Sequence, residues 1–128
     1  MSAKKILLVD DNNHLRTMMS LLLKDDGYDV TEVAEGSETM MWVHEHGFDL
    51  ILLDIMMPLL DGYTVLRYIR NTSRNGQTPV VIVSARAQEA DIERGYELGA
   101  NAYVTKPFEP NQLLSTVRDL VNASSDPS

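Results

Sequence analysis

The sequence predicts an α/β fold in which five short strands alternate with five longer helices. Two observations predict it: short apolar runs recur along the 128 residues, and the stretches between them carry apolar residues at helical spacing. This alternation is typical of βαβ units, which build a parallel sheet covered by helices on both faces. We therefore expect a doubly wound (βα)5 domain with a five-stranded parallel sheet.

The expected strands differ in how apolar they are. The first, third and fourth contain at least four consecutive apolar residues, as strands buried on both faces should. Thr31 and Glu32 interrupt the second, which indicates a strand at the edge of the sheet. The expected strands are Lys5 to Val9, Asp29 to Val33, Leu50 to Leu53, Val80 to Val83 and Ala102 to Thr105.

The helices between them are predicted by apolar residues spaced three and four apart and by glycines that favour helix ends. The expected ranges are about 13–24 before Gly27, about 37–46 before Gly47, a third helix after Asp61-Gly62, about 87–98 before Gly99, and a fifth after Pro107. Residues 73–78 form the most loop-like internal segment. We expect one domain over residues 1–122 and a flexible, Ser-rich tail over residues 123–128.

The common strand order for such a chain is 2-1-3-4-5, a flavodoxin-like arrangement, and its ligands bind outside the carboxyl ends of the strands. Polar residues follow four strands at that edge: Asp10 and Asp11, then Asp54, Ser84 and Lys106. One Asp after a strand is more often a turn former or a helix cap. Three converging carboxylates, however, would repel one another without a cation, and oxygen ligands suit Mg²⁺ or Mn²⁺.

Composition excludes several functions. Nineteen acidic and eleven basic residues give a net charge of −8, which argues against direct binding of nucleic acid, since that requires clustered Lys and Arg. The chain has no cysteine, so it has no disulfide framework and no thiolate site. The apolar runs are too short for a membrane helix and no signal peptide is recognisable, so we expect no membrane contact and a cytoplasmic location.

Four sequence segments together resemble the receiver domains of two-component response regulators, over about residues 4 to 122. They are Val9-Asp10-Asp11, the run from Asp54 to Gly62 (DIMMPLLDG), Ser84-Ala85, and the run from Gly99 to Phe108 (GANAYVTKPF).

The resemblance implies a role for each residue. Asp54 would accept the phosphoryl group, and Lys106 would contact the phosphoryl oxygens. Asp11, Asp54 and the backbone carbonyl of Met56 would bind the metal directly, and Asp10 would act through metal-bound water. The Lys106-Pro107 bond would be cis.

Ser84 and Tyr103 would form a switch in such a domain. Ser84 would hydrogen-bond the phosphoryl group, and Tyr103 would then turn inward. Two plainer interpretations stay open: Ser84 could cap the fourth helix, and Tyr103 could be an ordinary half-buried tyrosine of the sheet.

The resemblance also implies partners. A histidine kinase or histidine phosphotransfer protein would supply the phosphoryl group. A downstream protein, or a second copy of the chain, would bind the face formed by the fourth helix, the fifth strand and the fifth helix. We expect a regulatory phosphoacceptor, not an enzyme with a separate substrate, which catalyses its own phosphorylation and dephosphorylation.

The strongest alternative is a haloacid-dehalogenase-type phosphatase, which uses a similar set of residues with Mg²⁺. That class needs a second Asp two residues after its nucleophile, where this chain has Met56. A nucleotide-binding module is disfavoured because no Gly-rich loop follows the first strand. The sequence leaves open whether the domain stands alone or belongs to a longer regulator.

Overall fold

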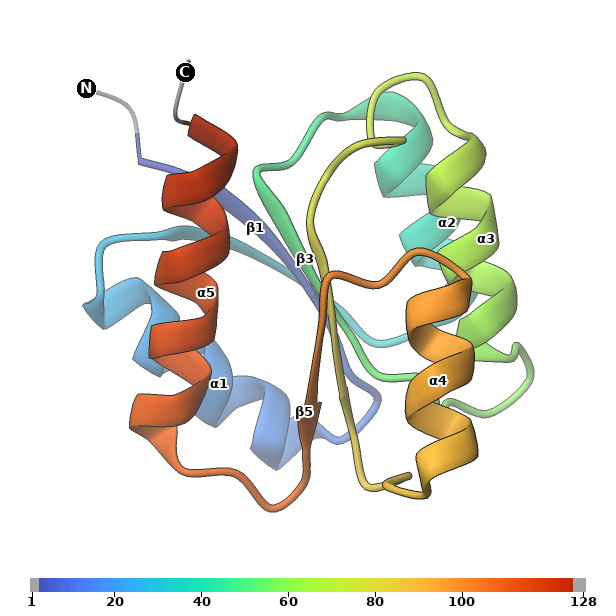
Figure 1. Ribbon diagram of the computed structural model, residues 1–128. Helices are drawn as coiled ribbons and strands as arrows, with labels where there is room; N and C mark the ends of the chain where they lie inside the picture. Colours follow the sequence, from blue (N-terminus) through green and yellow to red (C-terminus); the bar gives the residue numbers. More distant parts are fainter. Residues whose placement is uncertain (1–2, 126–128) are drawn as a thin grey trace.

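The computed structural model describes residues 3–125 and confirms the predicted architecture (Figure 1). All neighbouring strands are parallel, and the sheet order is β2-β1-β3-β4-β5. The strands are β1 (Lys5–Val9), β2 (Asp29–Val33), β3 (Leu50–Leu53), β4 (Val80–Ser84) and β5 (Ala102–Thr105). The helices are α1 (Asn13–Asp25), α2 (Gly36–Glu45), α3 (Gly62–Asn71), α4 (Glu89–Glu97) and α5 (Pro110–Ser125).

The helices form one layer on each face of the sheet, with α1 and α5 on one side and α2, α3 and α4 on the other (Figure 1). Alternate residues of the central strands feed two separate cores, because successive side chains of a strand point to opposite faces. Leu7 and Ile51 pack with α2 and α3, whereas Ile6 and Leu52 pack with α1 and α5. The apolar runs of the sequence therefore are strands buried on both faces, and β2 lies at the edge as predicted.

Gly27 and Gly99 have positive φ angles of 97° and 108°, which confirms the predicted helix ends there. Gly47 was expected to end α2 in the same way, and this expectation is wrong. The helix ends in extended backbone at His46, with φ −132°. The side-chain amide of Asn75 donates to the carbonyl oxygens of Val43 and His46 at 2.6 and 2.7 Å, so these groups need no glycine cap.

Two other boundaries differ from the prediction. Helix α4 begins at Glu89, two residues late, because the backbone after β4 first forms a turn in which the Ser84 hydroxyl accepts the N–H of Arg86. Helix α5 continues to Ser125, beyond the predicted end of the domain at residue 122, since no proline or glycine interrupts it. The rest of the predicted tail, residues 126–128, lies outside the described residues. The Lys106-Pro107 peptide bond is cis, as expected.

Candidate functional site

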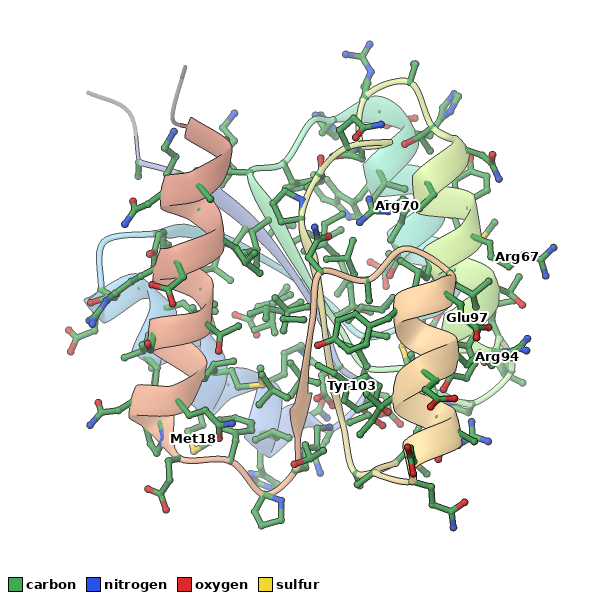
Figure 2. The ribbon with its side chains drawn as sticks, viewed as in Figure 1. Met18, Arg67, Arg70, Arg94, Glu97 and Tyr103 are labelled. Atoms are coloured by element: carbon green, nitrogen blue, oxygen red, sulfur yellow. The ribbon has the colours of Figure 1, made fainter. Side chains whose placement is uncertain are left out.

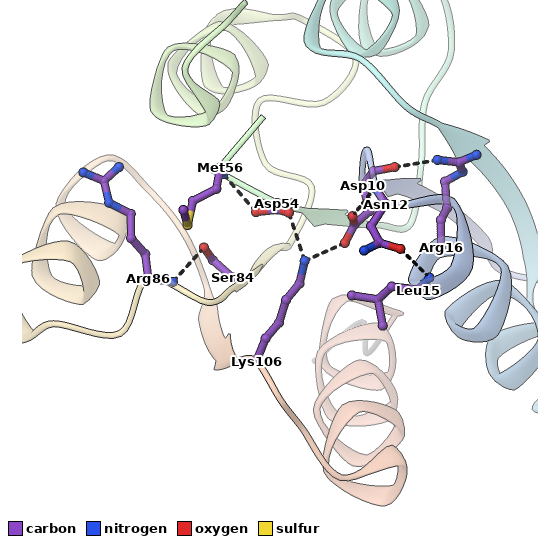
Figure 3. Close-up of polar contacts among 9 residues, drawn as sticks. All are labelled: Asp10, Asn12, Leu15, Arg16, Asp54, Met56, Ser84, Arg86 and Lys106. Carbon is purple, nitrogen blue, oxygen red and sulfur yellow. Dashed lines mark hydrogen bonds and ion pairs between the residues drawn. The ribbon is translucent and has the colours of Figure 1, made fainter. Parts of the chain in front are cut away.

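The carboxyl edge of the sheet brings the predicted polar residues together (Figure 3). Asp10 follows β1, Asp54 follows β3, and Lys106 follows β5. Asp10, Asp11 and Asp54 each offer a carboxylate oxygen, and these oxygens lie within 4.8 Å of one another. Asp10 and Asp54 are buried, with 1% and 4% exposure, whereas Asp11 is exposed. The cluster therefore opens to solvent on the Asp11 side.

Lys106 joins the two buried carboxylates. Its Nζ lies 2.8 Å from Oδ2 of Asp10 and 2.9 Å from Oδ2 of Asp54. Burial is the largest single influence and lowers the pKa of Lys106, but the hydrogen bonds to Asp10 and Asp54 and their negative charges together outweigh burial and raise this pKa above its ordinary value. The ammonium group is therefore a firmly charged cation between two strand ends.

Asp54 is subject to opposing influences. Burial is the largest and raises the pKa of its carboxyl, while the hydrogen bonds from the Met56 N–H and from Lys106 act in the opposite direction. The net result is a raised pKa. The carboxylate is thus poorly solvated and depends on nearby cations for its negative charge.

Short turns hold the other oxygens of the two buried carboxylates. The Met56 N–H donates to Oδ1 of Asp54, and the Asn12 N–H donates to Oδ1 of Asp10, both at 2.9 Å. Asn12 also caps α1 by accepting the N–H of Leu15 at 3.0 Å. Each carboxylate is therefore bound on one side by its own loop and on the other by Lys106, which leaves little freedom in its orientation.

Arg16 contributes to the site although sequence reasoning did not single it out. Its Nη1 donates to the backbone carbonyl of Asp10 at 2.7 Å (Figure 3). Its Nε lies 3.4 Å from a carboxylate oxygen of Glu32 on β2. Arg16 therefore ties the loop after β1 to the neighbouring strand. No sequence signal indicated this role, because an arginine on the first turns of a helix has the same spacing when it is merely solvated.

Ser84 and Tyr103 both contact the loop that follows β4. Ser84 is fully buried, and its Oγ accepts the Arg86 N–H at 3.1 Å. The Tyr103 hydroxyl donates to the carbonyl oxygen of the same Arg86. Ser84 therefore caps this loop. Because the N-cap residue of α4 is Gln88, the alternative that Ser84 caps the fourth helix is wrong.

Tyr103 lies on the side of the sheet that α4 covers (Figure 2). A Cβ placed on Gly95 of α4 would lie 3.4 Å from its ring, so helix and ring are in close contact. Burial, the largest influence, raises the pKa of Tyr103 to about 12. The tyrosine is half-buried and hydrogen-bonded at the loop, so its part in a switch stays a prediction, as does the metal-binding role of the Met56 carbonyl.

Comparison with known proteins identifies the family. Residues 6–118 match the response regulator receiver domain family. The receiver domain of the sensor histidine kinase PA1611 from Pseudomonas aeruginosa, described with a magnesium ion coordinated in its active site cleft, is similar in structure. It has a TM-score of 0.87 and 32% sequence identity, over 94% of this chain and 99% of that one. The chemotaxis response regulator CheY4 of Vibrio cholerae has a TM-score of 0.87 and 31% identity, over 93% and 99% of the two chains.

Curated relatives extend the comparison. The transcriptional regulatory protein YkoG of Bacillus subtilis is 42% identical over 113 residues, which cover 88% of this chain and 49% of the relative. The transcriptional regulatory protein ResD of the same species is 36% identical over 124 residues, 97% of this chain and 50% of the relative. The chain therefore spans about half the length of these relatives.

The family match and the fold together define a class of regulatory domains, not of classical enzymes. This chain belongs to that class as a member of the response regulator receiver domain family of two-component systems. The comparisons give no support to the haloacid-dehalogenase-type phosphatase. No helix in residues 3–125 combines the length and the apolar character that a membrane span requires.

Proposed function

We propose that this receiver domain takes a phosphoryl group from a phosphohistidine onto Asp54. The observation that carries the proposal is the Lys106 ammonium, which contacts Asp54 at 2.9 Å and Asp10 at 2.8 Å inside the three-carboxylate cluster. A buried carboxylate of raised pKa can attack phosphorus only if its negative charge and that of the phosphoryl group are balanced by cations. Lys106 provides one of them.

In the transfer, an Asp54 carboxylate oxygen bonds to phosphorus while the bond between phosphorus and the histidine nitrogen breaks. The electron pair leaves with the imidazole nitrogen, which then takes a proton from solvent. The hydrogen bond from the Met56 N–H to Oδ1 orients the Asp54 carboxylate for this attack. Lys106 remains charged throughout and binds the incoming phosphoryl oxygens.

The donor set of the cluster fits a hard divalent cation, because all its ligands are oxygens. Asp11 and Asp54, with the backbone carbonyl of Met56, would hold Mg²⁺, and Asp10 would act through bound water; Mn²⁺ would substitute. Bound Mg²⁺ supplies the second cation that phosphoryl transfer needs. The reported magnesium ion of the PA1611 receiver domain supports this choice.

The same groups would let the domain catalyse both its own phosphorylation and its own dephosphorylation. Its donor would be a histidine kinase or histidine phosphotransfer protein in the cytoplasm, where ATP is available. The phosphoryl group would bind Ser84, and the change at Ser84 and Tyr103 would alter the α4-β5-α5 face, to which a target protein or a second copy binds. The net charge of −8 supports a domain that does not bind DNA itself, although several relatives are DNA-binding regulators.

Intact-mass analysis after incubation with a small phosphodonor tests the proposal. With Mg²⁺, the wild-type protein should gain one phosphoryl group that hydroxylamine removes, and Asp54→Asn should gain none. Asp11→Ala should require far more Mg²⁺ for the same labelling, because it loses a direct ligand. Asp29→Asn, at an exposed acid on β2, is the matched control and should be labelled like the wild type. Equal labelling of Asp54→Asn and wild type would contradict the assignment of Asp54.

A further inference from the structure

Helix α4 is held by less apolar burial than its neighbours. Gly95 is the one buried residue of Glu89–Glu97, whereas α3 buries five residues. Burial of apolar surface is the main force that fixes a helix on a sheet. The position of α4 therefore depends on a few specific contacts, and these can be identified.

One contact comes from Tyr63 in the first turn of α3. Its ring is buried, with 3% exposure, and its hydroxyl donates to the backbone carbonyl of Asp91 at 3.0 Å. The guanidinium group of Arg94 on α4 lies over the Tyr63 ring, 5.0 Å from its centroid. A buried phenol hydroxyl needs a hydrogen-bond partner, and this one finds it on the neighbouring helix. Tyr63 thus connects α3 to the first turn of α4.

A second set of contacts holds the loop just before α4. The backbone of Arg86 bonds to Ser84 through its N–H and to Tyr103 through its carbonyl oxygen. Its side chain reaches forward to α4, where Nε lies 3.3 Å from Oδ1 of Asp91. Residues 86 to 91 are therefore held at the loop by Ser84 and Tyr103, and at the helix by Tyr63.

We propose that Tyr63 is a positioning residue that anchors the first turn of α4 to α3. A displacement of Ser84 would pull on the Arg86 N–H and move the loop over residues 85–88. Because the Tyr63 hydroxyl holds Asp91, the displacement is confined to this loop and the first turn of α4, and the rest of the helix keeps its position. This inference rests on the proposed function only for the source of the displacement, a phosphoryl group on Asp54; the anchor itself does not depend on it.

Tyr63→Phe removes the hydroxyl and keeps the ring that Arg94 covers, so it isolates the anchor. We expect amide hydrogen exchange over residues 89–95 to accelerate roughly fivefold, the effect of losing one hydrogen bond, in protein without metal or phosphodonor. Tyr96→Phe, at an exposed tyrosine of the same helix, is the matched control and should leave these rates unchanged. If the hydroxyl only stabilised the folded protein as a whole, the local opening of α4 would keep its rate in Tyr63→Phe. Unchanged rates over 89–95 would therefore overturn the inference.

A second measurement uses Mg²⁺ with beryllofluoride as a phosphoryl mimic. In the wild type, amide resonances should shift mainly over residues 84–91. In Tyr63→Phe, the shifts should extend along α4 to residue 97. Identical shift patterns in the two proteins would show that Tyr63 does not position the response. A wild type that does not respond to the mimic would contradict the proposed function, and hydrogen exchange would still decide on the anchor.

Discussion

Lys106→Met tests whether one cation holds the candidate site together. The substitution keeps most of the length of the side chain and removes the charge between Asp10 and Asp54, whose side chains are 1% and 5% exposed. At an effective dielectric constant of about 20, unit charges separated by 2.8 or 2.9 Å attract by about 6 kcal/mol per pair. The cost of desolvating the three groups offsets much of that attraction in the wild type.

The variant keeps the desolvation cost of the two carboxylates and loses the attraction. Removing one partner of a buried ion pair costs about 3–5 kcal/mol, so we expect the free energy of unfolding at pH 7 to fall by about 3 kcal/mol. The pKa of Asp54 is already raised by burial, and losing the lysine raises it further. A carboxyl with a raised pKa destabilises the folded state as pH rises through that pKa. The gap between variant and wild type should therefore shrink as the pH falls and Asp54 takes up a proton.

Urea denaturation at pH 7 and at pH 4, with and without Mg²⁺, measures these effects. Mg²⁺ should stabilise the variant more than the wild type, because it supplies the missing positive charge to the same carboxylates. Lys24→Met, at an exposed lysine of α1, is the control and should change stability by less than about 0.5 kcal/mol. A loss below about 0.5 kcal/mol in Lys106→Met, or an equal loss at both pH values, would refute the reasoning.

Two further predictions concern glycine packing and tyrosine ionisation. In Gly62→Ala the new Cβ would lie 2.2 Å from Cα of Ile55, so the backbone beside Asp54 must move. Urea denaturation should show that the free energy of unfolding falls by about 3 kcal/mol. Gly47→Ala meets no atom within 4 Å and should change stability by less than about 1 kcal/mol, and equal losses in the two would contradict this. Burial raises the pKa of Tyr103 to about 12 in the folded protein, above its ordinary value of about 10. The neutral hydroxyl therefore stabilises the folded protein below about pH 10, and this contribution is lost as the pH rises to 12. The phenolate absorbance difference between wild type and Tyr103→Phe should have its midpoint near 12, and a midpoint near 10 would disprove the burial argument.

The sequence by itself determined the five strands, their order and the edge at which the polar residues meet. These features follow from local patterns, because apolar runs define buried strands and right-handed crossovers leave few topologies. Asp10, Asp54 and Lys106 were predictable as neighbours for the same reason: each directly follows a strand of one parallel sheet. Gly27 and Gly99 ended their helices as predicted, since glycine adopts the left-handed backbone without the steric cost that a side chain brings.

Only the tertiary structure decided which side chains bind the backbone of helix ends and loops across the fold. Asn75 ends α2 from 29 and 32 residues away, Arg16 acts through the backbone of Asp10, and Tyr63 bonds to a residue 28 positions later in the chain. Sequence patterns repeat every two or 3.6 residues and carry no signal for such contacts. A side chain that donates one hydrogen bond across the fold has the same local sequence as one that faces solvent, and only packing brings donor and acceptor within about 3 Å.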